Sequence, residues 1–121
     1  MSGRKLAVVA FGGNALLRPE DRGTQEEQIA RAKQAARWLA EIVRHGYRLI
    51  VVHGNGPQVG NILIQAEEAS TKIPPQTLDV CGAQTQGSIG FLLQQAIRNR
   101  LEAIGIGGEG ATVLTELEVD L

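Results

Sequence analysis

Apolar residues in this chain form two short continuous runs, separated by a longer segment in which they recur at helical spacing. Residues 6–11 and 49–52 form the continuous runs. Runs of this length are typical of strands buried on both faces of a parallel sheet. The segment between them predicts an amphipathic helix, and the order strand, helix, strand predicts a right-handed βαβ unit. The apolar face of that helix carries Ile29, Ala32, Ala36, Leu39, Ala40 and Val43.

Local signals define both ends of this helix. The sequence Thr24-Gln25-Glu26-Glu27 matches a capping box, in which the Thr24 hydroxyl accepts from the Glu27 N–H and the Glu27 side chain reaches back. Gly46 stands where a C′ glycine ends a helix. The next strand is therefore expected over residues 48–53.

Two more helices are predicted after that strand. One runs from near Pro57 to about Ala69, and a loop containing Pro74-Pro75 follows it. A longer helix spans roughly residues 78–104, and glycines at 105–110 end it. A further strand is expected to begin at Thr112. The apolar stripe of the long helix consists of Ile89, Leu93, Ala96, Ile97, Leu101 and Ile104.

Glycine-rich loops follow both predicted strands, where a strand ends and a helix begins. Glycine lets the backbone approach a ligand closely and adopt positive φ, and Pro57 suits a first helical position. Unpaired N–H groups at a helix start form an anion site. Ligands of open α/β sheets bind beyond the carboxyl ends of the strands, so the two loops predict one anionic ligand held between them. The candidate residues are Gly12, Gly13, Asn14, Gly54, Asn55 and Gly56.

The first of these loops is unusually long. Twelve residues, 12–23, separate the first strand from the capping box. Connections in α/β units usually have about 2–6 residues, and longer ones are often functional. The length therefore favours a ligand-binding loop over a simple tight turn.

Composition argues against several classes of partner. A chain of 121 residues is one domain at most. Its net charge of -1 and its 3% aromatic content give no reason to expect nucleic acid. No segment reaches the ~20 apolar residues of a membrane span, and the interrupted run at residues 6–11 does not match a signal peptide. The single cysteine, Cys81, cannot form an intrachain disulfide, which suits a reducing cytoplasm.

The remaining reactive side chains have simple structural interpretations. His53 stands at a strand end without a visible ionisable partner, so we expect a backbone hydrogen bond rather than a general base. Cys81 is interpreted as a small helix hydrophobe. Asp79 lies where a carboxylate favours a helix start, and a metal role for it is the weaker hypothesis. The three lysines, Lys5, Lys33 and Lys72, all lie outside the glycine loops.

Three motifs occur in order along the chain: AFGGNALL at residues 10–17, HGNGPQVGN at 53–61 and LDVCGAQTQG at 78–87. Together they resemble the carbamate kinases, a branch of the amino acid kinase superfamily, and the match covers nearly the whole chain. Many other members of the superfamily carry a lysine just before the glycine pair. Ala10 stands there in this chain, which argues against acetylglutamate, aspartate and uridylate kinases.

The resemblance implies an α/β fold, a three-layer αβα sandwich around a mostly parallel sheet that is incomplete in this chain. It implies reversible phosphate transfer between carbamoyl phosphate and ADP, giving ATP and carbamate, with Mg2+, in cytoplasmic arginine metabolism. The six candidate residues would contact carbamate and the phosphoryl group. Backbone N–H donors suit that role, because they neutralise charge on the transferring oxygens.

Family members are longer than this chain. Residues 1–121 are therefore expected to be an N-terminal portion that binds carbamate and the phosphoryl group, with the catalytic lysines and the nucleotide site outside it. Such a piece is expected to be inactive alone. Two alternatives stay open, namely a kinase-like synthase that makes carbamoyl phosphate, and a non-catalytic module for anion binding or subunit interaction.

The long third helix is also a candidate homodimer interface, as the resemblance suggests. It carries small residues that permit close backbone approach, at Gly82, Ala83, Gly87 and Gly90. The alternative is that these residues pack within their own chain. Trp38 lies off the apolar stripe of the first helix and is expected to cover a partner or another part of the enzyme.

Overall fold

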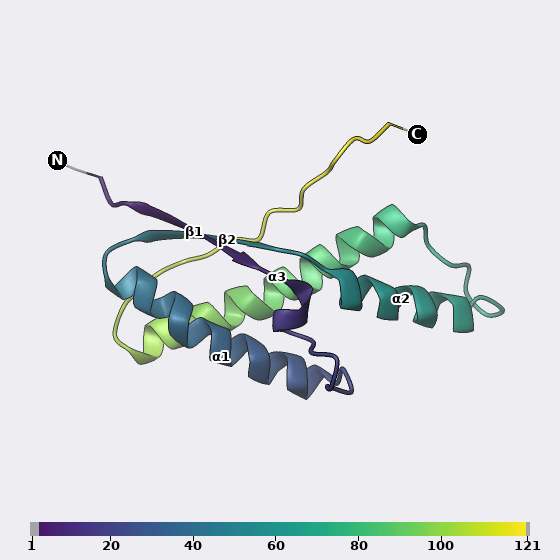
Figure 1. Ribbon diagram of the computed structural model, residues 1–121, viewed down its shortest axis with the longest axis horizontal. Helices are drawn as coiled ribbons and strands as arrows, with labels where there is room; N and C mark the ends of the chain where they lie inside the picture. The colour runs from purple at the N-terminus through teal and green to yellow at the C-terminus, as the bar shows by residue number, and fades with distance from the viewer. Residues whose placement is uncertain (1–2, 121) are drawn as a thin grey trace.

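The predicted helices and the first two predicted strands are present within about a residue of their expected bounds. The computed structural model describes residues 3–120 (Figure 1). No helix within that range is both long and apolar enough to cross a membrane. The elements are β1 (Leu6–Phe11), η1 (Gly13–Ala15, a 3-10 helix), α1 (Gln25–Arg44), β2 (Arg48–His53), α2 (Gly56–Glu68) and α3 (Leu78–Ala103).

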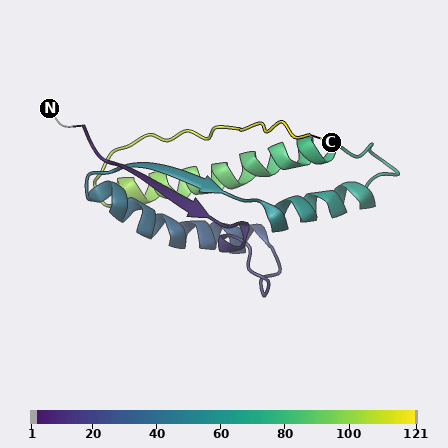
Figure 2. The ribbon, with the colours of Figure 1, turned by 45° about the horizontal axis from the view of Figure 1, so that its top comes forward.

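Strands β1 and β2 pair in parallel, with α1 as the connection between them. The register runs from Leu6 opposite Arg48 to Phe11 opposite His53, so the two strands end level with each other. The loops that follow them therefore leave the same edge of the sheet. Helix α2 continues outward from that edge (Figures 1 and 2).

The predicted ends of α1 are confirmed. Thr24 accepts from the Glu27 N–H at 3.2 Å, and the Glu27 carboxylate accepts from the Thr24 N–H at 3.2 Å. At the other end Gly46 has φ of 92°, a left-handed conformation that glycine adopts without steric cost. The chain can therefore turn sharply from α1 into β2.

The capping box makes a measurable prediction. Thr24→Ala should lower the free energy of unfolding by about 1 kcal/mol, because the Glu27 N–H loses its acceptor. Thr24→Ser keeps that acceptor and should stay near wild type. Urea denaturation of the three proteins checks this, and equal midpoints for the alanine and serine variants would contradict it.

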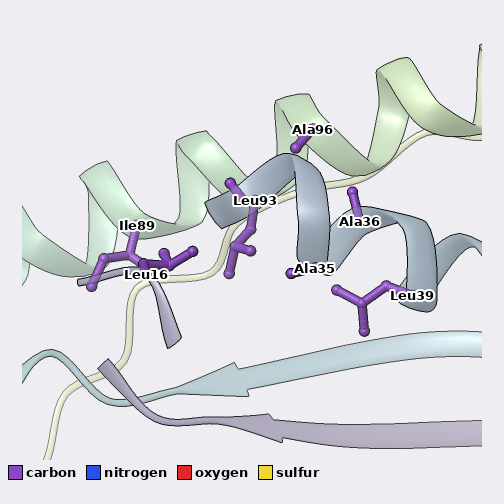
Figure 3. Packing of buried hydrophobic residues seen from close by; sticks show 8 residues of the cluster. Leu16, Ala35, Ala36, Leu39, Ile89, Leu93 and Ala96 are labelled. Atoms are coloured by element: carbon purple, nitrogen blue, oxygen red, sulfur yellow. The ribbon is translucent and has the colours of Figure 1, made fainter. Parts of the chain in front are cut away.

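The core lies between the sheet and two helices on one of its faces. Helices α1 and α3 pack together over β1 and β2, and Figure 3 shows Leu39 pointing from α1 toward the strands. The α1 stripe predicted from periodicity is buried or half-buried, and Trp38 is 73% exposed, as its position off the stripe predicts. The core cluster consists of Leu16, Ala32, Ala35, Ala36, Leu39, Ile89, Leu93 and Ala96.

The expectation that the strands are buried on both faces is wrong for residues 3–120. Val9, Phe11, Leu49 and Val51 face the helices, whereas alternate residues are exposed on the other side. Val8, for example, is 61% exposed. The α/β class and the parallel sheet are confirmed, with one helical layer of the expected two present in the described range.

The strand expected from Thr112 is also wrong for the described residues. The segment 106–120 is extended without strand pairing and runs beside α3 (Figure 2). The Gln86 side chain accepts from the Thr115 N–H at 2.8 Å and donates to the Thr115 carbonyl at 3.2 Å. The Thr112 hydroxyl donates to Gln94 Oε1 at 2.8 Å. Side-chain amides of α3 thus occupy some of the hydrogen-bonding groups that a neighbouring strand would use.

Candidate anion-binding site

The two glycine loops contact each other at the end of the sheet. The Gly54 N–H donates to the Phe11 carbonyl at 3.0 Å, extending the ladder by one bond past the strands. A Cβ placed on Gly54 would lie 3.7 Å from the Gly13 nitrogen. The fold therefore brings the two glycine loops together at one edge of the sheet, as the order of the elements predicts.

Both loops lead directly into helix starts that lack a side-chain cap. Gly12 precedes η1 and has no side chain to offer, and Asn55 precedes α2 without capping it. The first N–H groups of a helix have no intrahelical partner, so two sets of free donors lie at the same edge. Pro57 is the second residue of α2, one position later than expected. This arrangement favours an anion between the loops.

The glycines of the loops do not use positive φ, contrary to expectation. In residues 3–120, positive φ occurs only at Gly23, Gly46 and Gly105. The loop glycines instead serve close approach. A Cβ at Gly12 or at Gly56 would meet nothing within 4 Å, so these two glycines border open space.

Gly13 has a different environment, because it packs against the start of α2. A Cβ there would lie 2.9 Å from Gln58 Oε1 and 3.0 Å from Pro57 Cδ. Contacts below 3.0 Å are almost never seen for a real Cβ atom. Gly13 therefore allows the two loops to touch, whereas Gly12 and Gly56 leave room for a ligand.

Asn55 is oriented by helix α3. Its Nδ2 donates to Thr85 Oγ1 at 2.8 Å, and the Thr85 hydroxyl donates to the Gly82 carbonyl at 2.7 Å. Thr85 is fully buried. Its contribution was missed at the sequence level, although it lies in the third motif, because no spacing rule links positions 55 and 85. Asn14, by contrast, is exposed at the start of the site.

Gln58 is the second residue that sequence reasoning missed. It lies in the first turn of α2, is buried, and its Nε2 donates to the Gly13 carbonyl at 3.1 Å. It therefore joins the two glycine loops directly. Its position inside the second motif was the available signal.

The titratable residues near the site have structural roles. His53 Nδ1 lies 3.0 Å from the Gly54 carbonyl oxygen, so the expected backbone hydrogen bond is confirmed. Cys81 is a buried free thiol on α3, which agrees with its interpretation as a hydrophobe. The Thr77 hydroxyl, followed by the Val80 N–H, lowers the pKa of the Asp79 carboxyl. Asp79 therefore stays ionised at the start of α3.

The described residues do not offer a carboxylate set for a metal ion. Within residues 3–120 no three His, Cys, Asp or Glu side chains gather at one point. The two glycine loops contribute amides and backbone groups, whereas Mg2+ prefers carboxylate oxygens, water and phosphates. These residues therefore do not fit a protein-held Mg2+.

Packing within the chain explains part of the length of the loop after β1, which also borders the site. Leu16 and Leu17 are buried beneath it. Asp21 accepts from Arg31 Nη2 at 2.9 Å and from the Arg18 N–H at 3.1 Å, which fixes the loop to α1. Core packing and this ion pair account for part of its length, so length alone was a weaker argument than it appeared.

This ion pair predicts a pH dependence. The hydrogen bond from the Arg31 guanidinium lowers the pKa of Asp21, so its contribution is complete above the ordinary carboxyl pKa and is lost as pH falls through the lowered value. Asp21→Asn should therefore be less stable than wild type at pH 7, with the difference shrinking below about pH 4. Urea denaturation at several pH values checks this. A difference that stays constant down to pH 2 would contradict it.

A family model gives the broader relationship. The model described as "Amino acid kinase family" matches residues 5–118. The chain belongs to this family. The matched residues include both glycine loops and the start of α3.

Individual relatives are more specific. The chain is 48% identical over 119 residues to carbamate kinase 1 of Enterococcus faecium and 44% identical over 115 residues to the carbamate kinase of Pyrococcus horikoshii. These matches cover 98% and 93% of this chain but only 37% of each relative. The chain thus spans less than two fifths of the length of these curated relatives.

Solved structures give the same picture. A carbamate kinase from Giardia lamblia bound to AMP-PNP aligns with a TM-score of 0.81 and 37% identity. The alignment covers 88% of this chain and 33% of that protein. The arrangement of β1, β2 and their helices is therefore that of part of a carbamate kinase structure.

Proposed function

We propose that residues 1–121 form the carbamate- and phosphoryl-binding portion of a carbamate kinase, which transfers phosphate reversibly between carbamoyl phosphate and ADP. The observation that carries this proposal is the contact between the two glycine loops at one edge of the sheet, where helix α2 starts at Gly56 without a side-chain cap. The identity of this chain to carbamate kinases supports the choice of substrate.

The six candidate residues supply uncharged hydrogen-bond donors for the phosphoryl group. Phosphoryl transfer spreads negative charge over the transferring oxygens, and fixed N–H donors stabilise that charge without rearranging. Gly12 and Gly56 leave space beside those donors. Asn14 and Asn55 add side-chain amides at the same edge. The described loops contain no lysine, so we assign the catalytic lysines to a part outside this chain.

We also assign the nucleotide and Mg2+ to that other part. When bound, ADP would accept the phosphoryl group and Mg2+ would neutralise charge on its phosphates. A cytoplasmic enzyme of arginine metabolism suits this reaction, and a single free thiol, Cys81, is consistent with that location.

The reaction itself is the direct test. Purified full-length gene product, incubated with ADP and carbamoyl phosphate, should form ATP. The 121-residue chain alone should form none, because its glycine loops carry no lysine. Turnover by the isolated chain would overturn the assignment of the lysines to a part outside it.

The same assay tests the two alternative functions. A full-length product inactive in both directions would favour the non-catalytic module. A strong preference for making carbamoyl phosphate would favour the synthase.

We further propose that α3 forms a homodimer interface. Its exposed face carries Val80, Gly87 and Phe91, which lie within about 40° of one another at 3.6 residues per turn. Phe91 is 61% exposed, and a Cβ on Gly87 would meet nothing within 4 Å. Gly90 does not belong to this face, because a Cβ there would overlap the Thr112 side chain of the same chain.

Gly87→Arg should convert a full-length dimer into monomers, because an unpaired charge would be buried at the dimer interface. Gly107→Arg, at an exposed glycine outside α3, is the control and should leave the dimer intact. Sedimentation velocity gives the mass, and circular dichroism confirms folding. A folded Gly87→Arg dimer would place the interface elsewhere.

A further inference from the structure

Gln58 is one of two buried polar side chains in the described range, with 7% of its surface exposed. It lies in the first turn of α2 and donates through Nε2 to the carbonyl of Gly13. In residues 3–120 no other side chain makes a hydrogen bond between the two glycine loops. Besides the backbone bond from Gly54 to Phe11, the contact between Gln58 and Gly13 therefore holds the two loops together.

The other end of the same amide makes no bond. Within residues 3–120, Gln58 Oε1 is buried and has no hydrogen-bond partner. An unpaired buried acceptor costs about 1–3 kcal/mol, whereas an apolar side chain of the same shape avoids this cost. Packing alone would therefore favour methionine or leucine at this position. The donor to Gly13 is the feature that only the amide supplies.

We propose that Gln58 is a positioning residue for phosphoryl transfer, which holds Gly13 against the start of α2 so that the donors of both loops converge on one phosphoryl group. This inference rests on the proposed function. The Cβ site of Gly13 lies 2.9 Å from Gln58 Oε1, 3.0 Å from Pro57 Cδ and 3.2 Å from the Gly56 backbone nitrogen, so Gly13 packs closely against the start of α2. Misplacing a reacting group by about 1 Å can lower a rate roughly 100-fold.

Replacing the amide by an isosteric apolar side chain tests the hydrogen bond separately from the volume. In the full-length gene product, Gln58→Met should lower kcat about 30-fold and change KM for carbamoyl phosphate less than about threefold, because the loss falls on transition-state alignment. Gln65→Met, on the exposed face of the same helix, is the matched control and should leave both constants unchanged.

A second variant makes the same bond depend on pH. After Gln58→Glu, a protonated carboxyl can donate to the Gly13 carbonyl, whereas a carboxylate repels it. Burial raises the pKa of such a carboxyl. Neither η1 nor the first turn of α2 carries a titratable side chain, and the first two turns of α3, which also packs against α2, carry only Asp79 and Cys81, neither of which is a cation. The nearest titratable residue along the chain is His53. The ratio of variant to wild-type kcat should therefore rise about tenfold from pH 8.5 to pH 6.

The outcomes separate the two proposals. If wild-type gene product has no phosphoryl transfer in either direction, the proposed function fails. If the wild type is active, a Gln58→Met kcat within twofold of wild type overturns the positioning role. A Gln58→Glu ratio that is flat with pH also overturns it. Thermal melting of each variant identifies misfolded protein, and a Gln58→Met variant that does not fold leaves the decision to the pH profile of Gln58→Glu.

Discussion

Gly56→Ala should lower kcat/KM of the full-length gene product by a factor of about 10² to 10³ without unfolding it. A Cβ at Gly56 meets no protein atom within 4 Å, so the chain itself tolerates alanine. The added methyl group instead stands beside the first donors of α2, where the phosphoryl group must approach. Loss of one such donor typically costs about 2.7–4 kcal/mol of transition-state stabilisation.

Gly60→Ala is the matched control for this effect. Gly60 lies one helical turn further along α2, and a Cβ there also meets nothing within 4 Å. Alanine should stabilise the helix by about 0.5–1 kcal/mol and leave kcat/KM unchanged. Steady-state kinetics and thermal melting of both variants check the pair. A Gly56→Ala enzyme as active as Gly60→Ala would remove the start of α2 from the site.

Thr85→Val should lower both stability and activity, although Thr85 does not face the site. Valine has nearly the same shape but cannot accept from Asn55 Nδ2 at this buried position. We expect the free energy of unfolding to fall by about 1–3 kcal/mol, the usual cost of an unpaired buried polar group. The rate kcat should also fall about tenfold, because the loop at Asn55 loses its support from α3.

Two control variants test whether the bond from Asn55 to Thr85 causes the loss of activity. Thr85→Ser keeps the hydroxyl and should stay close to wild type in kcat. Ser88→Ala removes another α3 hydroxyl, which donates to the Thr85 carbonyl at 3.3 Å and makes no hydrogen bond to the loops within residues 3–120, and it should leave kcat unchanged. Urea denaturation and steady-state kinetics give the two readouts. If Thr85→Val and Ser88→Ala behaved alike, the bond to Asn55 would have no functional role.

The elements of this fold were predictable because their signals are local. The capping box at Thr24 and the left-handed glycine at Gly46 each depend on residues within one or two turns. The apolar run 6–11 and the apolar stripe of α1 likewise predict a strand and a helix from the spacing of apolar residues alone. The order strand, helix, strand then places both glycine loops at one edge of the sheet.

Other features depend on distant residues and could not be predicted this way. The strand expected from Thr112 needs a neighbouring strand, and in the described residues Gln86 and Gln94 bind that segment instead. Gly13 serves a contact between the loops rather than positive φ, which only its packing on Gln58 and Pro57 reveals. The bond from Asn55 to Thr85 spans thirty residues. No spacing rule connects such positions.

The location of the phosphoryl group tests the central claim most directly. A crystal structure of the full-length gene product with phosphonoacetamide, an unreactive analogue of carbamoyl phosphate, should show the phosphonate between the two loops. Its oxygens should lie about 2.7–3.1 Å from backbone nitrogens at the starts of η1 and α2. A phosphonate bound elsewhere, with both loops free of ligand, would contradict the account.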